Sequence, residues 1–280
     1  MHGGPFTWTM IAATTLGFGV IAIGLPIWLG RADPKLGRAC LGTMVLGLGL
    51  TLGLQALTDV PRPAHTSALL PAPALGSFPS GHAMLVSIAL AVAAARHRGI
   101  ALRVLPLALL VGYSRVALGH HHAVDVWAGA AIGLGLGWAA AGLCHTPSSD
   151  RWRWRWLLWP QLGFVAAITM LAYTGALASR PWLSLPGSDK VLHFLLFGAL
   201  AFGAHFWFRG RRWRRIPLAV ALPWTAALGE ELMQAASPHR TADPFDLLAD
   251  LLGLLVFWRL AEWLSREPGE HPGALRSTRR

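Results

Sequence analysis

The sequence predicts an all-α fold, a polytopic membrane bundle of about nine transmembrane helices in two units. Its 280 residues are 54% hydrophobic and only 13% charged, which is too apolar for a soluble domain of this length. Long apolar runs recur at lengths near the ~20 residues that a spanning helix needs. The short segments between these runs hold nearly all of the arginine and proline, as expected of loops at a membrane surface.

Each predicted helix coincides with one apolar run. No lysine or arginine precedes the first run, so we expect a retained helix and no cleaved signal peptide. Two of the runs, 81–95 and 191–208, are short for a spanning helix. The predicted helices cover residues 7–29, 37–57, 81–95, 101–118, 122–144, 157–178, 191–208, 216–236 and 245–264.

The distribution of positive charge predicts the orientation, because lysine and arginine accumulate in cytoplasmic loops. Counted along the predicted helices, one side of the membrane receives 19 of the 24 lysines and arginines. We therefore expect the N-terminus outside and the C-terminus in the cytoplasm. The five lysines and arginines on the outer side are Arg62, Arg115, Arg180, Lys190 and Arg240.

Membrane topology also explains the net charge of +11, so no nucleic-acid partner is expected.

Three separated segments of the first half carry most of its outward-facing polar residues. Arg62 follows the second predicted helix, residues 79–82 (Pro-Ser-Gly-His) open the third, and residues 114–125 join the fourth to the fifth. Because successive helices alternate in direction, all three segments reach the same membrane face. The sequence therefore predicts a single site there.

These segments offer the groups that phosphoryl transfer needs, which are cations and amide donors around the phosphate, a nucleophile, and an acid for the leaving oxygen. Arg62 and Arg115 carry planar guanidinium groups suited to phosphate. The amides of Ser80 and Gly81 lie at a predicted helix start, where they can hold an anion.

His121 is the candidate nucleophile. Asp125 lies one helical turn further on, so on a shared helix face its carboxylate would hold one imidazole nitrogen and leave the other free to attack. His82 is then the candidate acid. His120 and His122 flank His121, and the residue types alone do not choose among the three histidines.

The three segments resemble the type 2 phosphatidic acid phosphatase superfamily, whose pattern is Lys-x6-Arg-Pro, Pro-Ser-Gly-His and Ser-Arg-x5-His-x3-Asp. The second and third parts match fully. The resemblance implies a reaction without metal or cofactor in which His121 becomes a phosphohistidine, Asp125 is its partner and His82 is the acid. The phosphate ligands that it implies are Arg62, Ser80, Gly81 and Arg115.

One position departs from this pattern, since Gln55 stands where the family has lysine. A phosphate-binding cation is missing there, although the Gln55 amide can still donate a hydrogen bond to phosphate. We therefore expect altered phosphate recognition, with an inactive protein as the alternative.

Residues after about 150 are expected to form a second unit, so the predicted domains are 1–148 and 149–280. The polar residues 146–150 precede an alternating Arg/Trp run at 151–156, which we interpret as an interfacial anchor.

Polar side chains gather again at the outer ends of the last three predicted helices. Because ionisable groups in a bilayer are costly unless paired or wetted, this cluster is either a second site or an ion-pair lock between helices. Its members are Asp189, Lys190, His193, Glu230, Glu231, Gln234, Arg240, Asp243, Asp246 and Asp250.

This half resembles the VanZ-like family, whose pattern includes Asp-Lys-x2-His-Phe, Glu-x2-Gln, and Arg-x2-Asp-x2-Asp before a glycine-bearing span. The matching segments begin at Asp189, Glu231 and Arg240, and Gly253 is the glycine. Asp250 departs from the family, which has asparagine there. The resemblance implies a role in glycopeptide resistance or the cell envelope, without a defined reaction. A metal site is a further alternative, with ligands from Glu231, Asp243, Asp246 and Asp250.

Together these observations predict a lipid phosphatase of the bacterial inner (plasma) membrane with an extracytoplasmic active site. The expected substrate is a lipid phosphate or diphosphate. Undecaprenyl pyrophosphate is preferred, and phosphatidic acid or phosphatidylglycerol phosphate fit the motifs equally well. One alternative is a phosphotransferase that passes the phosphate to another lipid or sugar. The other is a non-catalytic protein that binds or moves lipids.

Overall fold

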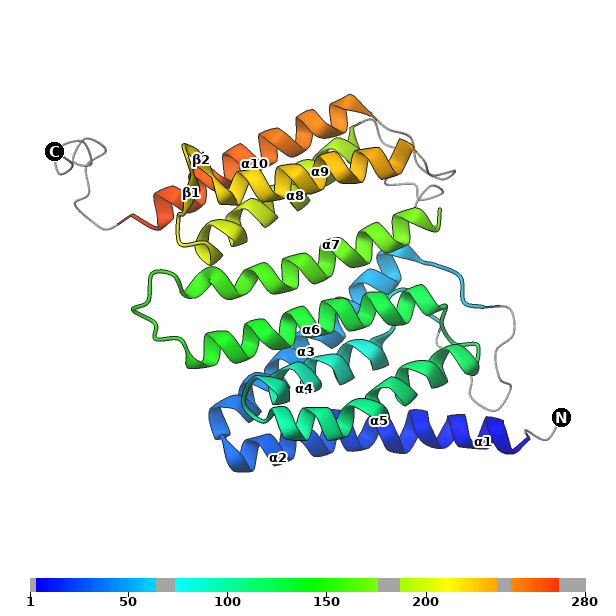
Figure 1. The fold of residues 1–280 in the computed structure, drawn as a ribbon. Helices are drawn as coiled ribbons and strands as arrows, with labels where there is room; N and C mark the ends of the chain where they lie inside the picture. Colours follow the sequence, from blue (N-terminus) through cyan, green and yellow to red (C-terminus); the bar gives the residue numbers. More distant parts are fainter. Residues whose placement is uncertain (1–3, 64–73, 176–186, 236–242, 267–280) are drawn as a thin grey trace.

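The computed structural model describes residues 4–63, 74–175, 187–235 and 243–266. Helices make up almost all of this part of the chain and run roughly parallel to one another in stacked layers (Figure 1). The predicted all-α, polytopic membrane architecture is therefore confirmed.

The first half forms a bundle whose first helix, Pro5–Ala32, is long and partly π-helical. A helix lies at each position that the apolar runs predicted. The elements are α1 (Pro5–Ala12), η1 (Ala13–Gly17), η2 (Val20–Gly24), α2 (Leu25–Ala32), α3 (Pro34–Thr58), α4 (Gly81–Arg96), α5 (Arg98–Ala117) and α6 (Ala123–His145).

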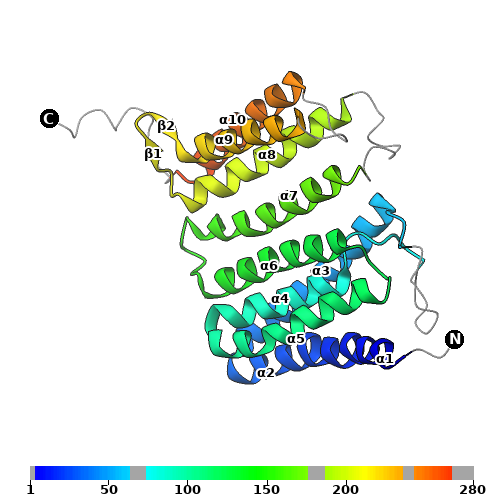
Figure 2. The same cartoon turned by 45° about the vertical axis from the view of Figure 1, so that its right-hand side comes forward.

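The second half packs on the first through α7, which lies between α6 and the last three helices in both views (Figures 1 and 2). Two short antiparallel strands connect α8 to α9, with Arg212 opposite Pro217 and Trp213 opposite Ile216. The elements are η3 (Arg153–Leu157), α7 (Leu158–Tyr173), α8 (Ser188–Trp207), β1 (Arg212–Trp213), β2 (Ile216–Pro217), α9 (Leu218–Ala235) and α10 (Pro244–Leu264).

Two hydrophobic cores hold the layers together, and α7 contributes to both. Ala167 and Leu171 belong to the core of the first half, whereas Leu158 belongs to the core that α8, α9 and α10 share. Opposite faces of one helix thus link the two halves.

Six helices of the described chain are long and apolar enough to cross a membrane. The apolar helix α4 is shorter, with 16 residues, so at 1.5 Å per residue it measures about 24 Å against a hydrocarbon core of about 30 Å. The six helices are Pro5–Ala32, Pro34–Thr58, Arg98–Ala117, Ala123–His145, Arg153–Tyr173 and Ser188–Trp207.

Capping residues explain where two of the helices begin. Asp33 precedes α3 and accepts a hydrogen bond from the backbone nitrogen of Lys35 at 3.0 Å. Asp243 precedes α10 and accepts one from the backbone nitrogen of Phe245 at 2.9 Å. In both cases a proline at the first helical position follows the aspartate, which is a strong signal for a helix start.

A stripe of glycines on α6 allows α4 to pack directly against it. The three glycines are spaced four residues apart, so they share one helix face. A Cβ atom at any of them would meet a backbone carbonyl oxygen of the α4 segment. The facing pairs are Gly129 with Ser80, Gly133 with Met84, and Gly137 with Ile88.

We predict that Gly133→Val separates α4 from α6, because the added atoms have no room beside the Met84 carbonyl and the Ser87 side chain. The expected loss in the free energy of unfolding is about 1–3 kcal/mol, measured as a lower melting temperature in detergent. Gly49→Val is the matched control, since a Cβ at Gly49 meets no atom within 4 Å. Equal losses in both variants would contradict this packing role.

Candidate functional site

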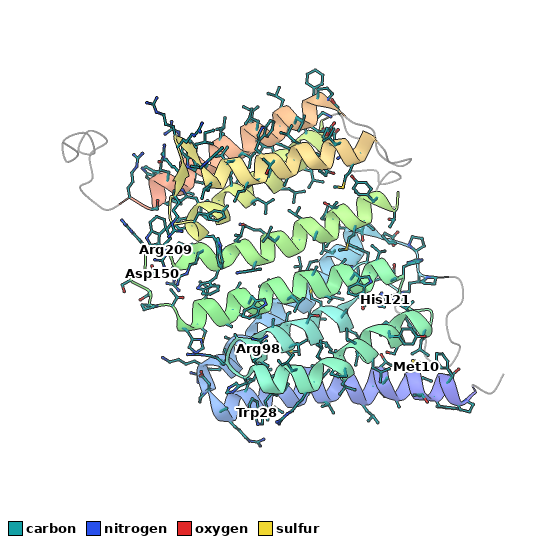
Figure 3. All side chains as sticks on the ribbon, viewed as in Figure 1. Met10, Trp28, Arg98, His121, Asp150 and Arg209 are labelled. Carbon is teal, nitrogen blue, oxygen red and sulfur yellow. The ribbon has the colours of Figure 1, made fainter. Side chains whose placement is uncertain are left out.

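The three polar segments of the first half meet at one end of the bundle. The Nη1 atom of Arg62 donates a hydrogen bond to the carbonyl of His120 at 2.8 Å, and the backbone nitrogen of Ser80 donates one to the carbonyl of Asp125 at 2.9 Å. Figure 3 shows His121 at this end, with Asp150 and Arg209 at the opposite end of the helices. The convergence expected from alternating helix directions is therefore present.

His121 lies in the turn between α5 and α6 and is 4% exposed. Its Nδ1 atom is 2.8 Å from the carbonyl oxygen of Ser77. A carbonyl can only accept, so Nδ1 carries the proton and Nε2 keeps a free lone pair. Burial lowers the pKa of His121, and the nearby Asp125 carboxylate opposes this shift only in part. The imidazole is therefore neutral at pH 7.

Asp125 does not share a helix face with His121, because α6 begins at Ala123 and His121 precedes it. That expectation was wrong. Its Oδ2 atom lies 3.7 Å from His121 Nδ1, too far for a hydrogen bond, and accepts one from the backbone nitrogen of His122 at 2.8 Å. The buried Oδ1 atom has no hydrogen-bond partner among the described residues. Asp125 thus caps α6 and acts on His121 mainly through its charge.

The two histidines beside His121 differ sharply in their surroundings. The His122 side chain is 45% exposed, with Nδ1 3.4 Å from the Asp125 carboxylate. His120 is buried, and in the described structure neither of its ring nitrogens has a hydrogen-bond partner. Burial, together with the charge of Arg115, lowers the pKa of His120 to about 4. Of the three, only His121 is buried and has one ring nitrogen fixed by a backbone acceptor.

Arg62 connects the loop before α4 to the turn before α6. Besides its bond to His120, the guanidinium donates from Nε to the carbonyl of Leu75 at 3.2 Å and from Nη2 to that of Gly76 at 3.0 Å. A guanidinium has five N–H donors, so two remain for a phosphate. Its positive charge also acts on the pKa of His121. The expected phosphate ligand is thus also a structural tether.

Arg115 is buried on α5 and is held by the first helix. Its Nη1 atom donates to the hydroxyl of Thr14 at 2.9 Å, while the buried Nε atom has no partner in the described chain. Thr14 was not among the predicted site residues, because no motif marks it. A polar residue within an apolar run was the only signal in the sequence.

The start of α4 supplies further donors. Ser80 is fully buried at the N-cap position, and its hydroxyl has no hydrogen-bond partner within the described residues. The first amides of a helix, beginning here at Gly81, lack partners within the helix and favour an anion. His82 lies in the same first turn, with its ring centroid 4.3 Å from that of Phe18, and is within electrostatic range of His121.

Gln55, expected to contact phosphate, contacts the backbone instead. It is 6% exposed, and its Nε2 atom donates to the carbonyl of Pro79 at 2.9 Å. The amide group therefore positions the chain immediately before Ser80.

The polar residues of the second half also converge, and Lys190 is at their centre. Its Nζ atom donates to Asp189 at 2.7 Å, to Asp246 at 2.8 Å and to Asp243. Among the described residues, the same three carboxylates lie close enough together to hold a cation, because their ligand atoms are within 4.8 Å of one another. The ammonium lies among them, so this part of the cluster forms an ion-pair lock between α8 and α10. The metal ligands given above as an alternative, Glu231, Asp243, Asp246 and Asp250, share only Asp243 and Asp246 with this group.

Beside this lock, His193 and Asp250 form a buried pair in which Nδ1 and Oδ1 are 3.0 Å apart. The Nε2 atom of Gln234 donates to Glu230, whereas its Oε1 atom and Oε1 of Glu231 are buried without partners in the described structure. Arg240 lies outside the described residues.

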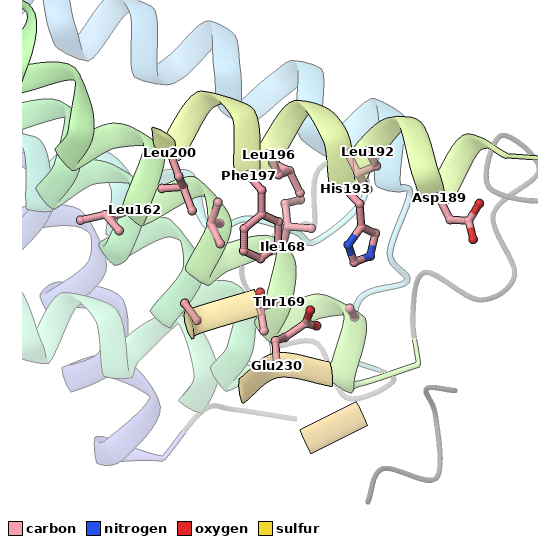
Figure 4. Close-up of a pocket in the computed structure, with 13 residues that line it drawn as sticks. Leu162, Ile168, Thr169, Asp189, Leu192, His193, Leu196, Phe197, Leu200 and Glu230 are labelled. Carbon is pink, nitrogen blue, oxygen red and sulfur yellow. The ribbon is translucent and has the colours of Figure 1, made fainter. Parts of the chain in front are cut away.

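A cavity of about 270 Å³ borders this pair, with His193, Glu230 and Asp189 among the residues that line it (Figure 4).

Comparison with known proteins gives a family match in the first half and matches to curated relatives. A family model described as the PAP2 superfamily matches residues 7–149. The chain is 37% identical over 110 residues to undecaprenyl-diphosphatase BcrC of Bacillus subtilis, covering 36% of this chain and 55% of that protein. It is 34% identical over 91 residues to the uncharacterized protein C11E3.10 of Schizosaccharomyces pombe, covering 32% of this chain and 54% of that protein. The chain spans about half the length of these curated relatives. No solved structure matches significantly.

The matched region contains each of the three segments that meet around His121, together with Gln55. Because the family model covers half of the chain, the protein belongs to the PAP2 superfamily.

Proposed function

We propose that this protein is a membrane phosphatase that hydrolyses a lipid diphosphate or phosphate through a phosphohistidine on His121. The observation that carries the proposal is the buried His121 ring, whose Nδ1 is fixed by the Ser77 carbonyl and whose Nε2 lone pair is free. The positive charges of Arg62 and Arg115 both act on this ring. A neutral nucleophile near two guanidinium groups suits attack on an anionic phosphoryl group.

The reaction proceeds in two steps. Nε2 of His121 attacks phosphorus, the P–O bond to the leaving group breaks, and His82 donates a proton to the leaving oxygen. His82 then accepts a proton from water as that water attacks the phosphohistidine, the N–P bond breaks, and phosphate leaves. Arg62, Arg115 and the first amides of α4 stabilise the equatorial oxygens throughout.

An apolar groove supports a lipid substrate. It has a volume of about 540 Å³ and lies between α4, α5 and α6. Two of its lining residues are chain neighbours of site residues, because Ala83 follows His82 and Val116 follows Arg115. A third, Ala123, lies with Asp125 in the first turn of α6. A hydrocarbon chain in the groove would place its phosphate at the site.

The preferred substrate is undecaprenyl diphosphate, with a glycerolipid phosphate as the alternative. The preference rests on the similarity to an undecaprenyl-diphosphatase and on the resemblance of residues 149–280 to the VanZ-like family, whose motif residues Lys190, His193, Asp243 and Asp246 converge. The charge distribution supports a site on the extracytoplasmic side of the inner membrane, with the N-terminus outside.

We predict that His121→Ala lowers phosphate release from undecaprenyl diphosphate at least about a thousandfold, because the nucleophile is lost. Purified protein in detergent, assayed without any acceptor lipid, gives the measurement. His122→Asn is the control, since this exposed residue keeps a capping side chain and should retain most of the activity. Activity that persists in His121→Ala would refute the nucleophile assignment. A strict need for an acceptor would identify a phosphotransferase.

The pH dependence should reflect the lowered pKa of His121. Only the neutral ring attacks, so kcat/KM should hold as the pH falls through 6.5, the ordinary value for histidine, and decline only below it. Asp125→Asn removes a charge that raises this pKa and should move the decline to still lower pH. If the decline came from ionisation of the substrate instead, it would occur at the same pH in both proteins. A decline at or above pH 6.5 in the wild type would contradict the assignment.

Filling the groove should discriminate between substrates by chain length. Ala130 lines the groove on α6, so Ala130→Phe should lower kcat/KM for a long-chain lipid phosphate about tenfold while changing that for a short-chain analogue little. Val45→Phe on the exposed face of α3 is the control, because Val45 is 72% exposed and lies outside the groove. Equal losses for both chain lengths would argue against the groove as the lipid site.

A further inference from the structure

The second half contains a cavity that the phosphatase reaction does not use. It has a volume of about 270 Å³ and lies between α7, α8 and α9. On α7 its lining includes Leu162 and Val165, and also Ile168 and Ala172, which pack in the core of the first half. No residue assigned to the phosphatase site lines this cavity, and its volume is just below the usual range for small-molecule sites.

The cavity is amphipathic along its length. Leu162 and Leu200 line one part of it, while His193, Glu230 and Asp189 bring polar groups to another (Figure 4). A ligand that fills both parts needs an apolar chain and a polar head.

Two buried polar groups at this end have bonding capacity left. His193 is 9% exposed, its Nδ1 atom is bonded to Asp250, and its Nε2 atom lies 3.6 Å from Asp246, beyond hydrogen-bond distance. Gln234 is fully buried and donates to Glu230, but its Oε1 atom has no partner among the described residues. Groups of this kind in a lipid-embedded helix bundle point to a ligand or to water.

The charge around the polar end selects the class of ligand. The described part of the cluster contains six carboxyl groups but only one lysine and one histidine, so its acids outnumber its bases. Lys190 is already bonded to three of the carboxylates. Glu230, which lines the cavity, accepts from the neutral amide of Gln234. This surplus disfavours a phosphate and favours a cation with N–H donors.

We propose that the cavity between α7, α8 and α9 is a second binding site, specific for the ammonium head of a single-chain amphiphile. Glu230 accepts from the ammonium group, with His193 beside it, and the apolar side chains of α7 and α8 surround the hydrocarbon chain. This site goes beyond the phosphatase activity, because it takes a ligand of opposite charge and shares none of the phosphatase residues.

The test uses the full chain in phosphatidylcholine nanodiscs with a photo-crosslinking dodecylammonium probe. Labelled peptides should map to the cavity-lining residues of α7 and α8. Dodecylamine should displace the probe about tenfold better than dodecanol, and dodecyl phosphate should not displace it. Equal displacement by dodecanol would indicate simple partition into the bilayer and would overturn the proposal.

Variants separate specific binding from general effects. Glu230→Gln keeps the shape of the side chain but removes its charge, and should reduce labelling about tenfold. Leu196→Trp should block the cavity by volume. Glu262→Gln is the matched control, because this acid on α10 is bonded to Arg212 and does not line the cavity. An unchanged elution profile and melting temperature show that each variant is folded. Unchanged labelling in Glu230→Gln would refute the proposal.

Discussion

The close approach of α4 to α6 is the contact on which the site around His121 depends. Glycines at every fourth position of α6 let the α4 backbone touch it, and the Ser80 amide bonds to the Asp125 carbonyl at their common end. Gly81 and His82 begin α4, and the turn that holds His121 precedes α6. This one packing contact therefore sets the spacing between His82 and His121, the proposed acid and nucleophile. Arg62 and Gln55 then fix the loops on either side of it.

The helices were predictable from sequence because the apolar runs are continuous and polar or helix-breaking residues separate them, even where a run is short. The convergence of the three polar segments was predictable too, since it follows from helix direction alone. The partner of His121 was not predictable. That partner is the backbone carbonyl of Ser77, and backbone acceptors carry no sequence signature. For the same reason the carbonyl bonds of Arg62 and Gln55 could not be foreseen from residue types that look like phosphate ligands.

The two polar clusters face the same end of the bundle but differ in charge. Around His121 the described cations exceed the acids, which suits an anionic group. Around His193 the acids exceed the cations, and much of the excess is held by Lys190 in a lock between α8 and α10. The sequence left an ion-pair lock and a second site as alternatives for this cluster, and the structure contains the lock beside a cavity that the lock does not fill.

The short length of α4 ties the protein to the thickness of its membrane. At about 24 Å, this helix is shorter than the hydrocarbon core of an average bilayer, which is about 30 Å thick. The bilayer around α4 must therefore thin, or the residues that flank the helix must lie within the hydrocarbon region. Thin, fluid bilayers lower the cost of that deformation, whereas thick, ordered ones raise it. The length of one helix thus links the packing around His121 to the thickness of the surrounding membrane.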